Sequence, residues 1–230
     1  MVEIGKILES LLSLQIPIDG ESGSWPQPPS QTPRRVDFGK FNGARARRRE
    51  SELSPRTTEI IESHAAGDSE GSLEEVLDVL AWYSPFHFYG DRWGIYLRED
   101  AILMLAGRIG HHLSGKRITD PEIVQDAIWS AVLTLYFHEA FHHYTESFAT
   151  RLELIEREER YRTYHHEVYA RSVGEDEPLE EALACADMIR RQSVEAGLKS
   201  VEPAVKQATL KMLNVWIPGL SHGYCKGLQF

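Results

Sequence analysis

Apolar side chains recur at three- and four-residue steps between residues 123 and 154, the spacing of one face of an α-helix. The stripe includes Ile128, Ala131 and Leu135. Asp120, Pro121 and Glu122 precede it, and a capping Asp, a first-turn Pro and an early acidic residue are typical of a helix start. The pattern predicts a long helix with one buried face.

The remaining patterns predict a mostly helical domain with a small sheet. Helical spacing predicts further helices over residues 2–14, 57–63, 73–82, 100–113, 177–187 and 203–215. Aromatic and β-branched residues between 86 and 97 flank Gly90 and Asp91, which is typical of a β-hairpin. We therefore expect an α+β fold in which helices dominate.

The N-terminal quarter of the chain has a different composition. Six of the eleven prolines lie before residue 57, among Gly, Ser and Arg and with few large apolar groups. Such a segment buries too little surface to offset the entropy lost on ordering, so residues 19–56 are expected to be a disordered basic linker. We expect a short amphipathic helix within 1–18 before it and one folded domain over 57–230. The linker is interpreted as a solubilising tail, with contact to nucleic acid, an anionic membrane surface or the domain's acidic face as alternatives.

Composition narrows the class of protein. The chain has 230 residues, 42% of them hydrophobic, with a net charge of −10, which argues against nucleic acid as a main partner. Two cysteines provide no disulfide framework and no cysteine-rich zinc site. No apolar run reaches the length of about eighteen residues that a membrane span needs, and the first residues lack a signal-peptide pattern. We expect a cytoplasmic protein without a membrane span.

The candidate chemistry lies within the long helix, in the sequence His138-Glu139-Ala140-Phe141-His142. Histidines four residues apart lie on one helix face, so both imidazoles can reach one metal ion. Glu139 projects about 100° further around the helix and can address a water on that metal. This H-E-x-x-H pattern predicts Zn²⁺ bound by His138 and His142, with Glu139 as general base. The alternative is a buried helix whose histidines pair with backbone or carboxylates, but three polar groups on an inward face are costly unless something satisfies them.

A catalytic zinc site needs a third protein ligand. The metzincin continuation is absent, because Thr145 and Phe148 stand where its Gly and third His would be. Glu146 would lie about 12 Å along the helix from His138 and is expected to brace a neighbouring group instead. In the helix predicted downstream, Glu180 and Glu181 precede the small residues 182 and 184–186, as a carboxylate presented to the motif helix would.

With these two segments the sequence resembles the gluzincin-type metallopeptidases, whose ligand glutamate sits in a pattern like E-x-x-(A/S)-(N/D). Glu181-Ala182-Leu183-Ala184-Cys185 follows that pattern and departs from it at Cys185. The resemblance implies Glu181 as third ligand, with Glu180 as the alternative if the register shifts by one. Over residues 86–191 the chain looks like bacterial zincin-like proteins and, more remotely, like the repressor-cleaving ImmA/IrrE-type peptidases. This resemblance implies a zincin-like fold.

The predicted function is a zinc-dependent metallopeptidase acting on a protein or peptide substrate. The segment between the two ligand helices offers Tyr161, Tyr164, His165, His166 and Tyr169 as oxyanion donors, and His166 or Tyr169 could serve. Residues 164–166 are interpreted first as a partly exposed turn. The strand predicted over 93–97 would pair with extended substrate, and packing explains its aromatic residues equally well. Two alternatives stay open: a zinc hydrolase of a non-peptide amide, and a non-catalytic regulatory or binding module whose metal is closed off by His143 or Cys185.

Overall fold

The computed structural model describes residues 65, 80–113, 120–170, 179–194, 201–220 and 223–230. These residues form a mostly helical fold with one two-stranded antiparallel sheet, which confirms the predicted helix-dominated α+β class. The helices predicted over 2–14 and 57–63, and the linker over 19–56, lie outside the described residues. None of the described helices is long and apolar enough to cross a membrane.

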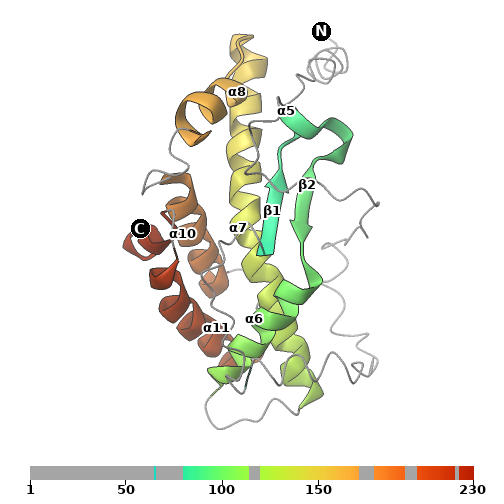
Figure 1. The fold of residues 1–230 in the computed structure, drawn as a ribbon, viewed down its shortest axis with the longest axis vertical. Coiled ribbons are helices and arrows are strands. Elements are labelled where there is room, and N and C mark those ends of the chain that lie inside the picture. Colours follow the sequence, from blue (N-terminus) through green and yellow to red (C-terminus); the bar gives the residue numbers. More distant parts are fainter. Residues whose placement is uncertain (1–64, 66–79, 114–119, 171–178, 195–200, 221–222) are drawn as a thin grey trace.

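The central element is helix α7, Pro121–Glu156, which runs along most of the molecule (Figure 1). Its start follows the sequence pattern, because the Asp120 side chain accepts a hydrogen bond from the Glu122 amide at 3.0 Å and Pro121 occupies the first turn. It ends at Arg157, whose left-handed φ of 57° lets its amide donate to the Glu153 carbonyl. The predicted motif helix is confirmed.

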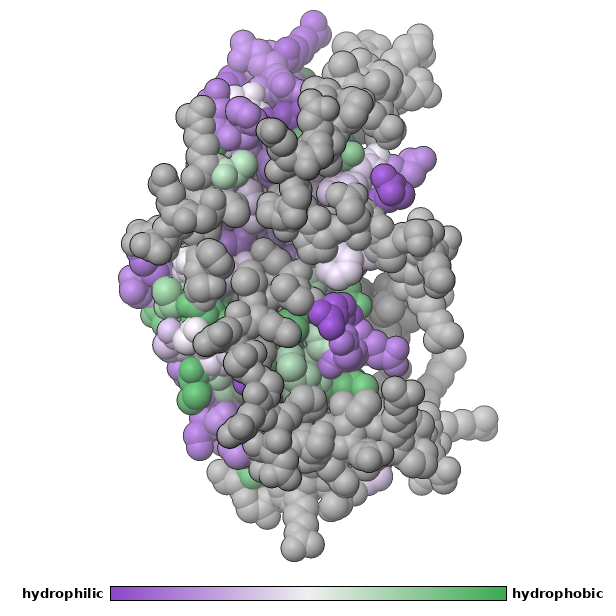
Figure 2. Space-filling view, viewed as in Figure 1, coloured by the Kyte–Doolittle hydropathy of each residue, from purple (hydrophilic) through white to green (hydrophobic). Residues whose placement is uncertain are grey.

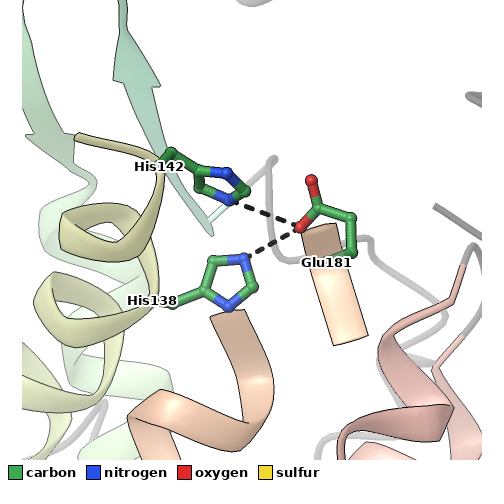
Figure 3. A group of neighbouring side chains, drawn as sticks. All are labelled: His138, His142 and Glu181. Atoms are coloured by element: carbon green, nitrogen blue, oxygen red, sulfur yellow. Dashed lines mark hydrogen bonds and ion pairs between the residues drawn. The ribbon is translucent and has the colours of Figure 1, made fainter. Parts of the chain in front are cut away.

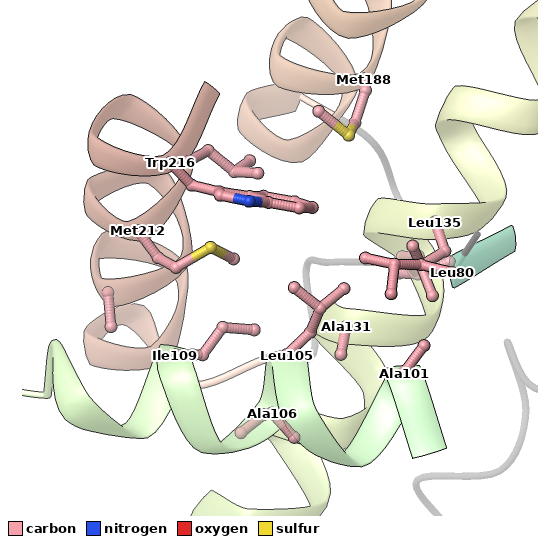
Figure 4. Close-up of a cluster of buried hydrophobic side chains, with 14 of the residues drawn as sticks. Leu80, Ala101, Leu105, Ala106, Ile109, Ala131, Leu135, Met188, Met212 and Trp216 are labelled. Atoms are coloured by element: carbon pink, nitrogen blue, oxygen red, sulfur yellow. The ribbon is translucent and has the colours of Figure 1, made fainter. Parts of the chain in front are cut away.

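Three helices pack around the first half of α7 and form the core. They are α6 (Glu99–His111), α10 (Leu179–Val194) and α11 (Pro203–Trp216). α6 and α11 lie close to their predicted ranges, and α10 continues past its predicted end at residue 187. Figure 4 shows Leu105 and Ile109 of α6 meeting Met212 and Trp216 of α11, with Met188 of α10 nearby. Each such buried side chain contributes about 1.5–3 kcal/mol relative to an exposed one. This core fixes α10 against α7, and both helices carry predicted metal ligands.

The sheet lies on the other side of α7 (Figure 1). Strand β1, Ala81–Ser84, pairs antiparallel with β2, Gly94–Leu97, in a register that places Ala81 opposite Leu97. The short helices α5 (Phe86–Tyr89) and η2 (Gly90–Arg92) connect the two strands. β2 confirms the predicted strand over 93–97 except for its first residue.

The first arm of the predicted hairpin was wrong, as was the end of the helix predicted over 73–82. Residues 81–84 form the first strand, and residues 86–89 form a helix instead. Pro85 ends the strand, and its carbonyl accepts the amides of Phe88 and Tyr89. The Glu146 carboxylate of α7 binds the amides of Phe86 and His87 at 3.1 and 2.9 Å. This long-range cap favours a helical turn in a segment whose local composition favours a strand.

The connection from α7 to α10 begins with two short helical turns, α8 (Tyr161–Tyr164) and the π-helical η3 (His165–Tyr169). The residues just before it, 156–160, are exposed Glu and Arg. Figure 2 shows hydrophilic side chains gathered at this end of the molecule. Arg160 pairs there with Glu156 at 2.6 Å and Glu158 at 2.8 Å, exposed contacts that add little stability.

The described residues after α11 pack against the rest of the fold. After α11 the chain forms the 3-10 helices η5, Ile217–Gly219, and η6, Tyr224–Gln229. η6 packs against α10, with Tyr224 and Gly227 buried. This packing brings the last residues of the chain next to the predicted metal site.

Candidate metal centre

His138 and His142 lie one turn apart on α7 and both are buried. Their ring centroids are 5.2 Å apart, with the ring planes at 71°. Helix geometry produces this proximity, since residues at i and i+4 lie on one face. The two imidazoles are therefore presented together on the side of α7 that faces α10.

Glu181, in the first turn of α10, faces both imidazoles. Its Oε2 atom lies 3.1 Å from Nε2 of His138 and 3.5 Å from Nε2 of His142 (Figure 3). One donor atom from each of the three residues lies within 4.8 Å of the others, so the group could hold a metal ion. The structure thus brings together the three residues predicted as ligands. Two imidazoles and one carboxylate are a donor set that suits catalytic zinc.

Glu180 has a different position. Its Oε1 accepts a hydrogen bond from Nδ1 of His142 at 2.7 Å, and its Oε2 accepts one from the Tyr164 hydroxyl. It therefore binds the nitrogen of His142 that does not face Glu181. A carboxylate on the remote nitrogen fixes the tautomer of a metal-binding histidine and makes it a better ligand. The geometry favours Glu181 as ligand and Glu180 as the residue that orients His142.

The remote nitrogen of His138 faces a thiol. Nδ1 of His138 lies 3.8 Å from Sγ of Cys185, which is fully buried and not in a disulfide. This is the position at which the sequence departs from the gluzincin pattern. The thiol therefore faces the nitrogen that points away from Glu181.

His143 also lies away from the three-residue group. Its Nδ1 is 3.1 Å from the Tyr83 hydroxyl, and its ring stacks on Trp93 with centroids 5.4 Å apart. Of the two residues predicted as closing ligands, neither belongs to the possible metal-binding group found among the described residues. The donor set there is His, His and Glu.

Glu139 lies beside this group and is 1% exposed. Burial raises its pKa to about 8, while nearby His142 lowers it, the Glu181 carboxylate raises it and the amide of Tyr83 in β1 lowers it. Its Oε1 atom has no hydrogen-bond partner among the described residues. A buried carboxylate oxygen left unpaired is costly, so this atom indicates a missing polar partner such as a water on a metal.

The charge balance fits a cation at the same place. Burial alone would lower the pKa of His142, but the Glu181 and Glu180 carboxylates outweigh it and raise that pKa well above its usual value. Conversely, His142 and His138 hold the pKa of Glu181 below its usual value despite burial. Carboxylates thus face both ring nitrogens of His142, and a metal cation could balance this negative charge.

The structure separates the five candidates for an oxyanion donor. Tyr169 is buried, and its hydroxyl donates to Oε1 of Glu181 at 2.7 Å. Tyr164 binds Glu180, His165 stacks on Tyr169, Tyr161 packs on His87, and His166 is exposed. The predicted turn at 164–166 is helical, with His166 as its exposed residue. Tyr169 thus bonds to Glu181 and Tyr164 to Glu180, the alternative ligand, and an oxyanion role for Tyr169 stays a prediction.

A hydrogen-bond network around Glu146 lies next to the site, and the sequence predicted only part of it. Glu146 braces the segment after β1, as expected, by binding the amides of Phe86 and His87 and the Tyr83 hydroxyl. His87 was missed as its main partner, although its imidazole lies between Glu146 and Glu153. The one sequence signal for such a partner was Glu146 itself, because a carboxylate on the buried face of α7 needs a hydrogen-bond donor from another segment.

Comparison of the chain with protein-family models, with curated proteins and with solved structures finds no match. The resemblance to gluzincins therefore rests on the two sequence motifs alone.

Proposed function

We propose that the protein is a zinc-dependent peptidase, with His138, His142 and Glu181 as ligands and Glu139 as general base. The observation that carries this proposal is the unpartnered, buried Oε1 of Glu139 beside three converging donor atoms. A structural histidine–carboxylate cluster explains the three donors, but it gives no partner to Glu139. A water held between a metal and Glu139 satisfies both.

Bound zinc would lower the pKa of a water toward about 7 and polarise the substrate carbonyl. Glu139 takes a proton from the attacking water as the new C–O bond forms. It then returns this proton to the amine nitrogen as the C–N bond breaks.

The neighbouring residues set the geometry for this step. Glu180 holds His142 through Nδ1, so that Nε2 is the atom turned toward Glu181. Tyr169 binds the Glu181 oxygen that is not directed at the histidines, which favours coordination through Oε2 alone. From the same position we propose its hydroxyl as the donor for the developing oxyanion.

A peptide is the substrate class that the sheet supports. Within the described ranges, β2 pairs with β1 on one side only. Both strands pack against α7, and the backbone of Tyr83 in β1 is near enough to lower the pKa of Glu139. An extended peptide can add to an open sheet edge through main-chain hydrogen bonds. The same four site residues could hydrolyse a peptide or a small non-peptide amide. The open sheet edge favours the peptide.

The donor set favours an enzyme over a metal-stabilised binding module. A structural zinc site is usually closed by four protein ligands, and the group among the described residues offers three. Cys185 and His143, the two residues expected to close such a site, bond elsewhere. We also propose a cytoplasmic location, expected from the two cysteines and from the lack of a signal-peptide pattern and of a long apolar run.

The test compares Glu139→Gln with Glu156→Gln, a matched change at an exposed position of α7. Each zinc-loaded protein is incubated with a defined mixture of unstructured peptides, and cleavage is followed by mass spectrometry. Glu139→Gln should keep its zinc and lose about 10²–10⁴ in rate, while Glu156→Gln cleaves like the unaltered protein. Equal cleavage by the two variants contradicts the assignment of Glu139.

A further inference from the structure

The C-terminal helix η6 packs directly behind His138. The Tyr224 ring lies with its centroid 5.7 Å from that of His138. Three residues further on, Gly227 packs against Cys185 so closely that a Cβ atom at position 227 would lie 2.4 Å from the Cys185 Cβ and 3.2 Å from the Ala182 carbonyl oxygen. A side chain at 227 would therefore displace Cys185 or the α10 backbone.

We propose that Cys185 is a positioning residue for His138, and that Gly227 of η6 holds its thiol in place. The last residues of the chain would thus set the metal affinity of a centre whose ligands come from α7 and α10. The inference rests on the proposed function in one respect, because it takes Nε2 of His138 as the atom that binds metal.

The argument begins with the tautomer of His138. If Nε2 gives its lone pair to a metal, the ring proton sits on Nδ1. His138 is fully buried, so this N–H needs an acceptor within the protein. Sγ of Cys185 lies 3.8 Å from it, a long contact with a weak acceptor.

The two histidines therefore differ in the group that faces the ring nitrogen remote from Glu181. His142 has a carboxylate at 2.7 Å on its remote nitrogen, whereas His138 has a thiol at 3.8 Å. Because the thiol bond is weaker, the orientation of His138 depends more on packing, which Tyr224 and Gly227 provide. His138 is the ligand whose position should respond to changes in η6.

The experiment measures zinc affinity in the full chain by competition with a chromogenic chelator. Cys185→Ala removes the acceptor, and Cys185→Asn restores one, since an amide oxygen extends further from Cβ than sulfur does. We expect Cys185→Ala to lose about 10–100-fold in affinity and Cys185→Asn to retain more of it. If Cys185 acted through packing alone, the zinc affinity of each variant would follow its thermal stability. Cys185→Asn, which buries the larger side chain, would then lose more zinc affinity than Cys185→Ala.

Gly227→Ala tests the role of η6, with Gly219→Ala as its matched control. A Cβ at 219 meets nothing within 4 Å among the described residues, so this control should bind zinc like the unaltered protein. Gly227→Ala should lose affinity by a factor similar to Cys185→Ala. If Gly227→Ala does not fold, the two Cys185 variants decide the matter.

Two results would overturn the inference. One is a folded Cys185→Ala protein with unchanged zinc affinity, and the other is equal losses in Cys185→Ala and Cys185→Asn. Both leave the proposed peptidase intact, because the unaltered protein still binds zinc. Absence of zinc binding by the unaltered protein would instead remove the proposed function, and this inference with it.

Discussion

The imidazole of His87 donates to Oε1 of Glu146 at 2.6 Å, joining residues 59 positions apart in the chain. Its other ring nitrogen lies 2.9 Å from Oε2 of Glu153, so both nitrogens face carboxylates. Glu153 also accepts the amides of Arg160 and Tyr161 at 2.8 Å. The network fixes the segment between the strands against α7, and thereby fixes β1 beside Glu139.

The first prediction concerns this network. Glu146→Ala leaves Nδ1 of His87 and the amides of Phe86 and His87 without their acceptor, which should lower the free energy of unfolding by about 3–5 kcal/mol. Urea unfolding measures the loss, with the exposed Glu156→Ala as control. A change no larger than that of the control would show that the network contributes nothing to stability.

The second prediction concerns pH. Burial alone lowers the pKa of His87, but its bonds to Glu146 and Glu153 outweigh this and raise it above its usual value near 6.5. A raised folded-state pKa means that the stability contributed by the charged imidazole is fully present below the unfolded pKa. It is lost as the pH rises through the folded pKa.

The measurement is the difference in unfolding free energy between the unaltered protein and His87→Gln, from pH 5 to 9. Subtraction of the variant removes the titration of groups that the two proteins share. The difference should shrink as the pH rises above about 6.5. A difference that grows with pH would show that His87 is neutral in the folded protein.

The third prediction separates the neighbouring glutamates. Glu181→Ala should remove zinc binding at micromolar metal, because it deletes a proposed ligand. Glu180→Ala should retain binding but weaken it about 10–100-fold, because it deletes the partner of His142. Chelator competition distinguishes the two, and the reverse order would assign the ligand to Glu180.

The fourth prediction concerns Tyr169. Tyr169→Phe removes the hydroxyl next to Glu181 and should lower kcat by about 10²–10³ while zinc stays bound. Tyr144→Phe, at a half-exposed position of α7, serves as control and should change neither value. Loss of zinc from Tyr169→Phe would mean that the hydroxyl supports the metal centre rather than the oxyanion.

The sequence predicts those parts of the fold and site that depend on local periodicity. His138 and His142 share a face because of helix geometry alone, and the small residues after Glu181 indicate a helix that packs closely. The turn at 86–89 depends instead on a carboxylate about sixty residues away, and no local pattern contains that information. The role proposed for Cys185 has no local sequence signal for the same reason, since it depends on contacts with α7 and η6.

The central claim is that the three convergent residues bind zinc, and the most direct test is the metal content of the purified chain. Elemental analysis without chelators should find close to one zinc per chain in the unaltered protein and in Glu139→Gln. His138→Ala should lose most of it. Unaltered protein that is folded yet free of any transition metal, and that takes up none on addition of zinc, would contradict the account.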